Sequence, residues 1–238
     1  MNIAVIPARG GSKRIPRKNI NSFCGRPMIA WAIELAKNAG LFEHIIVSTD
    51  DLEIAKISTN WGAEVPFLRP PSLADDFTPT VPVMSHAVRQ CMRLGWNADY
   101  FCCIYPCTPL LKYDDLIRAL DCIQKKDVDF VYPVTEFQHP IQRAMRMGKT
   151  GAMEFLTPEN ELKRTQDFEE CFHDAGQFYW GKTDAWLENK RMHTGGLGMK
   201  IPSWRVVDID TAADWHRAEV MKEVYDKLGS QSPGAESD

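Results

Sequence analysis

Near its amino terminus the chain reads Ile3-Ala4-Val5-Ile6-Pro7-Ala8-Arg9-Gly10-Gly11-Ser12-Lys13-Arg14-Ile15-Pro16-Arg17-Lys18-Asn19. The first four residues of this stretch are apolar and three of them are β-branched, which favours a strand covered on both faces, as in a parallel sheet. The glycine-containing loop that follows would leave the carboxyl end of this strand, where open α/β sheets bind their ligands. The pattern therefore predicts an α/β fold with a ligand site at this loop.

The loop also concentrates positive charge. Five of the ten residues from Arg9 to Lys18 are Lys or Arg and none is acidic, although the whole chain has a formal net charge of -4. This concentration favours a local anion, most simply a polyphosphate. Gly10 and Gly11 permit positive φ and a close ligand approach, and Ser12 adds a hydroxyl donor. The alternative is a solvated basic turn.

Composition bounds the class of protein. A length of 238 residues with 44% hydrophobic content fits one domain over residues 1–228, and the apolar-poor residues 229–238 are expected to be disordered. The sequence has neither a membrane-length apolar run nor a signal-peptide pattern, so we expect a cytoplasmic protein without a membrane partner. Seven cysteines without a C-x-x-C pair favour reduced thiols. Without a further basic face, nucleic acid is not an expected partner.

Beyond the first loop, apolar runs alternate with amphipathic segments in the βαβ pattern. Strands are expected at residues 44–49, 62–68, 100–104, 129–134, the second half of 173–181, and 205–210. Helices are expected at residues 28–36, 52–61, 83–94, 114–125 and 212–228. Gly40 should end the first helix and Asp50-Asp51 should cap the second. The last helix should bury a stripe formed by Trp215, Ala218, Met221, Val224, Tyr225 and Leu228.

Two segments interrupt this pattern. Residues 135–172 contain prolines, glycines and several basic residues, and we interpret them as an insertion, either an arm that pairs with a second subunit or a lid over the substrate. Residues 69–80 form a long loop of the kind that is often functional. Within it, Arg69 is a candidate ligand contact, with a surface salt bridge as the alternative.

Asp208 and Asp210 are spaced i, i+2, which on a strand places both carboxylates on one face. Two adjacent carboxylates suit Mg²⁺, which takes such ligands together with substrate phosphate oxygens. The alternative is capping of the last helix by Asp210-Thr211, and both roles can coexist. A polyphosphate loop with a metal pair predicts phosphoryl or nucleotidyl transfer. The loop matches neither G-x-x-x-x-G-K-[ST] nor G-x-G-x-x-G, which disfavours P-loop NTPases and dinucleotide dehydrogenases.

The motif from Ile6 to Lys13, with Pro16 and Lys18-Asn19, resembles the signature loop of the CMP-sugar synthetases, cytidylyltransferases that activate nine-carbon acidic sugars. Further matches in the family's order are Ser48-Thr49-Asp50, Arg69-Pro70, Leu73-Ala74-Asp75, Pro106 to Pro109, and Asp208-Ile209-Asp210. The resemblance spans about residues 1 to 225. It implies a Rossmann-like, mostly parallel sheet flanked by helices, of the nucleotidyltransferase type with an inserted arm. It also implies a Mg²⁺ requirement and a homodimer with an interlocking arm.

By this resemblance, Arg9 and Lys13 would be catalytic, holding the triphosphate of CTP, and Asp208 and Asp210 would hold the metal. The implied nucleotide-binding residues are Ala8, Gly10, Gly11, Ser12, Lys18, Asn19, Arg69 and Thr80. The anomeric hydroxyl of the sugar would attack the α-phosphorus of CTP and pyrophosphate would leave. No side chain is assigned as the base.

On the sugar side, the sequence departs from the sialic acid branch at Gln142 and His173, where that branch usually carries lysine and arginine. The block from His173 to Gly181 most resembles the branch that activates pseudaminic acid. The implied sugar-binding residues are Tyr105, Gln142, Arg164, Gln166, His173 and Gln177. His173 has a structural alternative at a strand end. Two alternatives remain for the whole protein, a synthetase for sialic or legionaminic acid and a non-catalytic nucleotide-binding regulator.

Overall fold

The computed structural model describes residues 1–229. The tail expected at residues 229–238 therefore lies outside the described residues, except for Gly229 at the end of the last helix.

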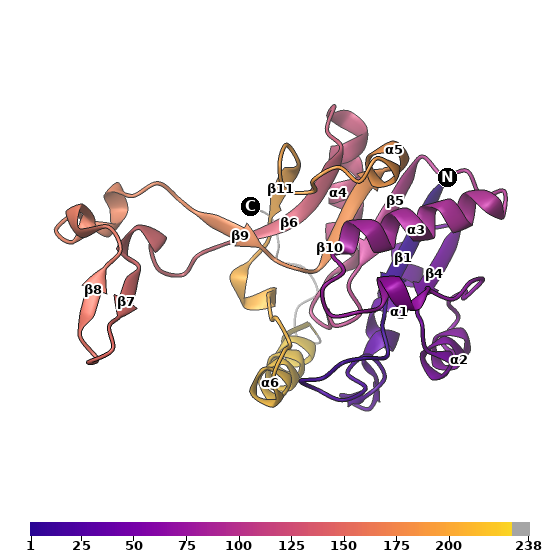
Figure 1. The fold of residues 1–238 in the computed structure, drawn as a ribbon, viewed down its shortest axis with the longest axis horizontal. Coiled ribbons are helices and arrows are strands. Elements are labelled where there is room, and N and C mark those ends of the chain that lie inside the picture. Colours follow the sequence, from indigo (N-terminus) through magenta and orange to yellow (C-terminus); the bar gives the residue numbers. More distant parts are fainter. Residues whose placement is uncertain (230–238) are drawn as a thin grey trace.

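A central seven-stranded sheet has the order β11-β6-β10-β5-β1-β4, and β9 pairs with β6 (Figure 1). β10 is antiparallel to β5 and to β6, β9 is antiparallel to β6, and the remaining pairs are parallel. The bounds are β1 (Asn2–Pro7), β4 (His44–Ser48), β5 (Tyr100–Ile104), β6 (Phe130–Glu136), β9 (Phe172–Asp174), β10 (Phe178–Lys182) and β11 (Leu197–Lys200). The predicted mostly parallel sheet is confirmed.

Helices cover both faces of the sheet, in three layers. One face is covered by α1 (Met28–Ala39), α2 (Leu52–Asn60) and α4 (Tyr113–Lys125), and the other by α3 (Thr80–Arg93) and α5 (Thr183–Leu187). The last helix, α6 (Ala212–Gly229), packs near Phe23, outside these two layers. Residues 1–229 also contain five single 3₁₀ turns, which are η1 (Pro71–Leu73), η2 (Ile141–Arg143), η3 (Pro158–Asn160), η4 (Thr165–Asp167) and η5 (Ser203–Arg205). Two short hairpins pair β2 (Ser22–Phe23) with β3 (Arg26–Pro27), and β7 (Met145–Met147) with β8 (Met153–Phe155).

Strand β1 contributes side chains to the two apolar cores, one on each face of the sheet, as its apolar run predicts. Ala4 and Ile6 pack with residues of α1, α2 and α4, whereas Ile3 and Val5 pack with residues of α3 and α5. All four side chains are fully buried. Because neighbouring residues of a strand point to opposite faces, four successive apolar residues are needed where both faces are covered.

Local signals place several helix ends correctly. Gly40 ends α1 in the left-handed conformation at φ 63°, which glycine adopts without a steric penalty. Asp51 caps α2, where its carboxylate accepts hydrogen bonds from the backbone N–H groups of Glu53 and Ile54. The sequence therefore encodes these boundaries through single residues.

Among the described residues, other expectations are wrong. Residues 62–68 form an isolated bridge between Ile46 and Glu64 in place of a strand, and Pro66 cannot donate to a ladder. Residues 206–210 are irregular and pair with no strand, and Ile209 packs near Phe23, outside the two cores of the sheet. Helix α3 begins at Thr80 rather than at residue 83. In α6, Val224 is 51% exposed, and the side chain of residue 228 lies outside the described part.

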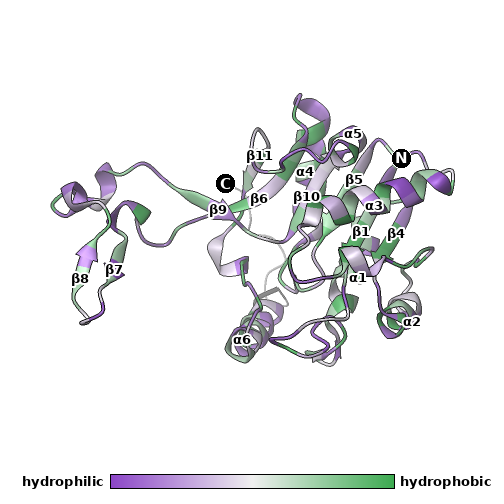
Figure 2. Cartoon of the chain, in the orientation of Figure 1, coloured by the Kyte–Doolittle hydropathy of each residue, from purple (hydrophilic) through white to green (hydrophobic). Residues whose placement is uncertain are grey.

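Residues 137–171 leave the sheet after β6 and return through β9, and they extend away from the body as an arm that carries β7 and β8 (Figure 1). Figure 2 shows apolar segments along this arm. Its exposed apolar side chains include Met145, Met147, Met153, Leu156 and Leu162. The insertion thus projects from the body and does not cover the carboxyl edge of its own sheet.

Within residues 1–229, none of the helices combines the length and the apolar character that a membrane crossing requires. All seven cysteines carry free thiols, as expected, and Cys102 and Cys103 are buried in β5.

Candidate functional site

The first loop is tied to the carboxyl end of β4. The backbone N–H of Ala8 donates to the carbonyl of Ser48 at 3.0 Å, and that of Gly10 donates to a carboxylate oxygen of Asp50 at 3.0 Å. The buried Asn19 closes the loop by donating its side-chain amide to the carbonyl of Arg9 at 2.9 Å. The loop is therefore held in place before any ligand binds.

Glycine is required at position 10 for its size. Neither Gly10 nor Gly11 adopts positive φ, so the conformational reason expected from the sequence is wrong. A Cβ at Gly10 would lie 2.6 Å from a carboxylate oxygen of Asp51. A Cβ at Gly11 would meet open space, and the N–H of Ser12 donates to the carbonyl of Gly10 at 3.1 Å.

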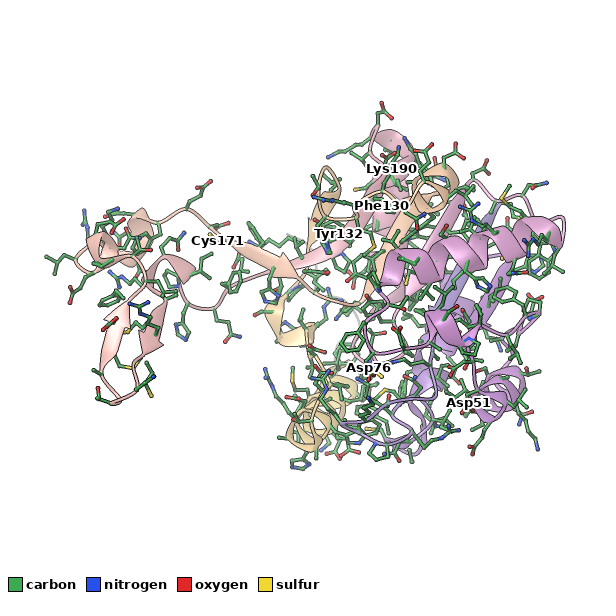
Figure 3. All side chains as sticks on the ribbon, viewed as in Figure 1. Asp51, Asp76, Phe130, Tyr132, Cys171 and Lys190 are labelled. Atoms are coloured by element: carbon green, nitrogen blue, oxygen red, sulfur yellow. The ribbon has the colours of Figure 1, made fainter. Side chains whose placement is uncertain are left out.

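Arg9 and Lys13 share one anion. The guanidinium of Arg9 lies 2.6 Å from one carboxylate oxygen of Asp76, and the ammonium of Lys13 lies 2.5 Å from the other. Hydrogen bonds from Lys13 and Arg9 lower the pKa of Asp76. Figure 3 shows Asp76 on the same side of the molecule as α6. The two cations predicted to hold a triphosphate are thus already arranged around a carboxylate.

The other end of the chain meets the same loop. Arg14 contacts the carboxylate of Asp210 at 2.8 Å and Lys18 contacts it at 3.5 Å. Lys18 also donates to the backbone carbonyl of Ile209 at 2.6 Å. The cationic loop and the acidic pair therefore converge at one edge of the sheet, although Asp208 and Asp210 lie on an irregular segment rather than on a strand.

The acidic pair suits a cation. The side chain of Asp208 remains accessible, but nearby protein atoms enclose it enough to raise its pKa, and the charge of Asp210 raises it further. Capping of α6 is done by Thr211 and Asp214, because the hydroxyl of Thr211 accepts from the N–H of Asp214 at 3.2 Å. Asp210 is therefore not needed as the cap. Within residues 1–229, no group of three or more His, Cys, Asp or Glu side chains could hold a metal alone. The pair nevertheless fits Mg²⁺, which takes one or two carboxylates and completes its shell with phosphate oxygens and water.

Arg69 is buried, with 5% of its surface exposed, which contradicts a surface salt bridge. It donates to the hydroxyl of Ser48 at 3.3 Å and also to the backbone carbonyl of that residue. Burial lowers the pKa of Arg69 to about 10. Arg69 thus lies under the same edge of the sheet, at the end of β4. Nearby, the hydroxyls of Thr80 and Tyr105 are 2.5 Å apart, and burial raises the pKa of Tyr105 to about 12.

Three predicted sugar residues lie on the body. The N–H of Tyr105 donates to the carbonyl of Gln177 at 2.8 Å. The amide of Gln177 donates to the carbonyl of Arg205 at 2.7 Å, and its own oxygen is buried without a hydrogen-bond partner in the described residues. His173 lies in β9, where its Nδ1 donates to the carbonyl of Asp174 at 2.9 Å and its ring packs against Phe137. These contacts within one chain show that His173 has the structural role at a strand end that was the alternative to sugar binding.

The other three predicted sugar residues lie on the arm. The amide of Gln142 donates to the carbonyl of Glu169 at 2.9 Å, and Arg164 contacts Asp167 at 3.4 Å. Gln166 lies in the 3₁₀ turn η4. Figure 3 shows Cys171 where the arm meets the body. One chain does not bring these residues together with Arg9 and Lys13.

Sequence reasoning missed Asp76, Asp174, Tyr179 and His193. Asp174 accepts hydrogen bonds from the hydroxyl of Tyr179 at 2.6 Å and from the ring of His193 at 2.8 Å. The aromatic run of β10 could have identified Tyr179 as a buried residue, since Phe178, Tyr179 and Trp180 are all buried. No local pattern relates His193 to Asp174, because Asp174 ends β9 and His193 lies in the irregular segment before β11.

A cavity of about 570 Å³ lies at the opposite edge of the sheet, lined by residues that include Tyr100 and Lys182. Tyr100 begins β5 and Lys182 ends the antiparallel β10, so this cavity is at the amino ends of the parallel strands. None of the predicted site residues lines it.

The comparisons with known proteins agree with this geometry. A family model described as cytidylyltransferase matches residues 3–222. The chain is 37% identical over 224 residues to the pseudaminic acid cytidylyltransferase of Campylobacter jejuni subsp. jejuni serotype O:2, covering 94% of this chain and 97% of that protein. It is 32% identical over 235 residues to N-acylneuraminate cytidylyltransferase A of Danio rerio, covering 97% of this chain and 53% of that protein.

Among solved structures, CMP:2-keto-3-deoxy-manno-octonic acid synthetase complexed with CTP matches with a TM-score of 0.70 and 16% identity, covering 94% of this chain and 99% of that one. At this identity the likeness shows a shared fold. The extent of the family match and the identity to the Campylobacter protein together show that this chain belongs to the cytidylyltransferase family.

Proposed function

We propose that the protein transfers CMP from CTP to the anomeric hydroxyl of a nonulosonic acid, with pseudaminic acid as the preferred sugar. The observation that carries the proposal is that the cationic first loop and the acidic pair lie together at one edge of the sheet. Arg9 and Lys13 surround a carboxylate there, and Asp210 contacts Arg14 and Lys18 of the same loop. Membership of the cytidylyltransferase family supports CTP as the donor.

In this reaction the sugar hydroxyl attacks the α-phosphorus of CTP and the bond to the pyrophosphate oxygen breaks. The negative charge of the leaving group grows as that bond breaks, and positioned cations stabilise it. Arg9 and Lys13 would exchange Asp76 for the phosphates. The nucleotide would be oriented by Lys18 and by the anchored backbone of Ala8, Gly10, Gly11, Ser12 and Asn19. Arg69 and Thr80 would lie on its base and ribose side.

Mg²⁺ is part of the proposal as a cofactor. Asp208 and Asp210 would hold it, and when bound it would neutralise charge on the phosphates. Support comes from the raised pKa of Asp208, because a cation relieves the cost of two neighbouring carboxylates.

A homodimer joined through the arm is also proposed. The arm exposes 71% of Met147 and 94% of Leu162, and a second copy would cover such side chains. Gln142, Arg164 and Gln166 would then complete the sugar site of the partner, together with Tyr105, His173 and Gln177 of that subunit. A cytoplasmic location is also proposed, because it fits the seven free thiols.

Two observations favour pseudaminic acid as the sugar. The block from His173 to Gly181 resembles the pseudaminic acid branch, and the Campylobacter relative named for that sugar is 37% identical over nearly its full length. Sialic or legionaminic acid remains the alternative within the same reaction. A non-catalytic regulator is disfavoured because Arg9, Lys13, Asp208 and Asp210 are all present.

Pyrophosphate release tests the proposal directly. The protein is incubated with CTP and Mg²⁺ and with pseudaminic, sialic or legionaminic acid in turn, and ATP, GTP and UTP replace CTP in control reactions. We expect release with CTP and the highest kcat/KM with pseudaminic acid. Highest kcat/KM with another sugar would change the substrate, and no release with any sugar would refute the enzymatic proposal.

A further inference from the structure

A fixed histidine lies at the carboxyl edge of the sheet and has no role in the proposed transfer so far. The Nε2 of His193 is 2.8 Å from one carboxylate oxygen of Asp174, and the hydroxyl of Tyr179 is 2.6 Å from the same oxygen. The other oxygen accepts the backbone N–H of Gly176 at 2.8 Å. Asp174 thus collects three hydrogen bonds, two from residues that closely follow it in the chain and one from the more distant His193.

This arrangement fixes the proton on the imidazole ring. An ionised carboxylate only accepts hydrogen bonds, so Nε2 of His193 must be the donor. In a neutral imidazole the other nitrogen, Nδ1, then carries a lone pair and can only accept. No hydrogen-bond partner for Nδ1 is found among residues 1–229, and 54% of the side chain is exposed. In its neutral form the ring therefore presents a defined acceptor to its surroundings.

Aromatic neighbours fix the plane of this ring. The rings of His193 and Tyr132 are 5.1 Å apart at an angle of 80°, and those of His193 and Tyr179 are 6.2 Å apart at 89°. Edge-to-face contacts of this kind are favourable and directional. The backbone after the histidine is held as well, because Gly196 approaches the ring of Tyr132 so closely that a Cβ there would lie 2.9 Å from it. Figure 3 shows Tyr132 within the body, where it lies on β6.

The histidine is connected to the nucleotide side of the site by a continuous row of polar side chains. Asp174 pairs with Val134 near the carboxyl end of β6. The ring of Tyr179 lies 5.3 Å from that of Tyr105, whose hydroxyl is 2.5 Å from the hydroxyl of Thr80. The row thus begins at Thr80, on the nucleotide side of the site, and ends at His193, which lies farther from the nucleotide. A substrate that extends beyond the nucleotide along this edge would meet His193.

We propose that His193 is a specificity-determining residue for the sugar, accepting through Nδ1 a hydrogen bond from a hydroxyl or amide N–H of the nonulosonic acid, with Asp174 as the positioning residue. This inference rests on the proposed function. Because the contact is made to the sugar away from the phosphates, it changes recognition of the sugar and leaves nucleotide binding unaffected.

The first test compares three variants in pyrophosphate release with CTP and the preferred sugar. His193→Phe keeps an aromatic ring against Tyr132 but has no acceptor, so KM for the sugar should rise about three- to tenfold, the value of one hydrogen bond, with KM for CTP and kcat little changed. His193→Asn keeps an acceptor near the position of Nδ1 and should show a smaller rise. Asp174→Asn removes the charge that fixes the ring proton and should also raise KM for the sugar.

His44→Phe is the matched control. His44 also contacts a carboxylate, that of Glu64 at 2.8 Å, and stacks on an aromatic ring, that of Trp96 at 3.7 Å. It begins β4 and therefore lies at the amino edge of the sheet. All kinetic constants of this variant should match those of the wild-type protein.

The second test identifies the donor on the sugar. Analogues that lack one hydroxyl, and analogues with one acylamino nitrogen methylated, are compared with the parent sugar. In the wild-type protein one analogue should lose about three- to tenfold in kcat/KM, and in His193→Phe that preference should disappear. The analogue affected distinguishes a hydroxyl from an amide N–H.

The outcomes separate this inference from the function on which it rests. If folded His193→Phe shows wild-type turnover and an unchanged KM for the sugar, the inference is refuted and the proposed function stands. A large fall in kcat of this variant at an unchanged KM for the sugar also refutes the inference. If the wild-type protein neither releases pyrophosphate nor binds any of the three sugars by calorimetry, both proposals fail. If His193→Phe does not fold by circular dichroism, the comparison of His193→Asn with the wild-type protein on the analogues decides.

Discussion

Lys13 carries its charge on a side chain that is 80% exposed and pairs with Asp76. Exposed ion pairs contribute little to folding, because water solvates both charges well and the long side chain loses entropy when it is held. Function at this position can therefore be separated from stability, which is rare for buried site residues such as Arg69.

Replacing Lys13 by alanine should lower pyrophosphate release by at least about a hundredfold, because a preorganised charge that stabilises the leaving group is lost. The melting temperature should stay within experimental error of the wild-type value. Lys125→Ala is the control, since Lys125 is also an exposed lysine in an ion pair, with Asp121. Wild-type turnover in Lys13→Ala would remove this residue from the mechanism.

Asp210→Asn should raise the Mg²⁺ concentration needed for half-maximal activity by roughly tenfold or more, the scale on which metal sites respond to loss of a supporting group. The carboxamide is a weaker ligand for a hard cation than the carboxylate. Asp214→Asn is the control, because Asp214 caps α6 with Thr211 and should affect stability without changing the Mg²⁺ titration. Identical titrations in Asp210→Asn and the wild-type protein would exclude Asp210 as a ligand.

At the scale of elements, the amino end of α2 connects stability to the site. Asp51 caps the helix and also contacts Arg17 of the first loop at 2.5 Å. The hydrogen bond from Arg17 is the main cause that lowers the pKa of Asp51 to about 2, against a value of 3.8 for the free side chain. One carboxylate therefore stabilises both a helix and the loop.

The lowered pKa predicts the pH dependence of this contribution. A carboxylate with a lower pKa in the folded state stabilises that state when ionised, so its contribution is complete above about pH 4 and is lost as the pH falls through about 2. Asp51→Asn keeps a capping oxygen and loses the charge. In urea unfolding, the difference in free energy between the wild-type protein and Asp51→Asn should be constant from pH 7 to 5 and shrink towards pH 2. A pH-independent difference would contradict the assignment.

Asp51→Ala loses both the cap and the contact with Arg17, so the difference in unfolding free energy between Asp51→Ala and Asp51→Asn isolates the cap. That difference should be about 0.5–2 kcal/mol at neutral pH, the usual range for loss of a capping residue.

At the scale of the whole molecule, the body and the arm present different surfaces. The body buries its apolar residues on both faces of the sheet, whereas the arm leaves Met147 and Leu162 largely exposed. A segment of this composition is better explained by contact with a second copy than by isolation in water.

Leu162→Asp should convert the proposed dimer into monomers, because a charge would be desolvated at the interface. Sedimentation velocity measures the change, and sugar turnover should fall with it, since the arm residues would no longer reach the partner. Leu52→Asp is the control, because Leu52 is 72% exposed but lies on α2 of the body. A wild-type protein that sediments as a monomer at all concentrations would refute the arm-mediated dimer.

The sequence alone determined the features that depend on neighbouring residues. The apolar run of β1, the left-handed Gly40 and the cap at Asp51 are each encoded within a few residues, and all three are confirmed. The pairing of a cationic loop with an acidic pair was also foreseen, because each group has its own local pattern. Local patterns failed at residues 62–68 and 205–210, since strand formation requires a neighbouring strand as well as a suitable sequence.

Only the tertiary structure decided which groups meet. Gly10 is required because Asp51 lies against it, Asp76 holds Arg9 and Lys13, and Asp174 orients His193. These partners are brought together by the order of the strands and by loops that cross the carboxyl edge of the sheet. Hydrogen bonds and ion pairs act over a few ångströms in space, whatever the separation in sequence, so their partners become known only when the chain is folded.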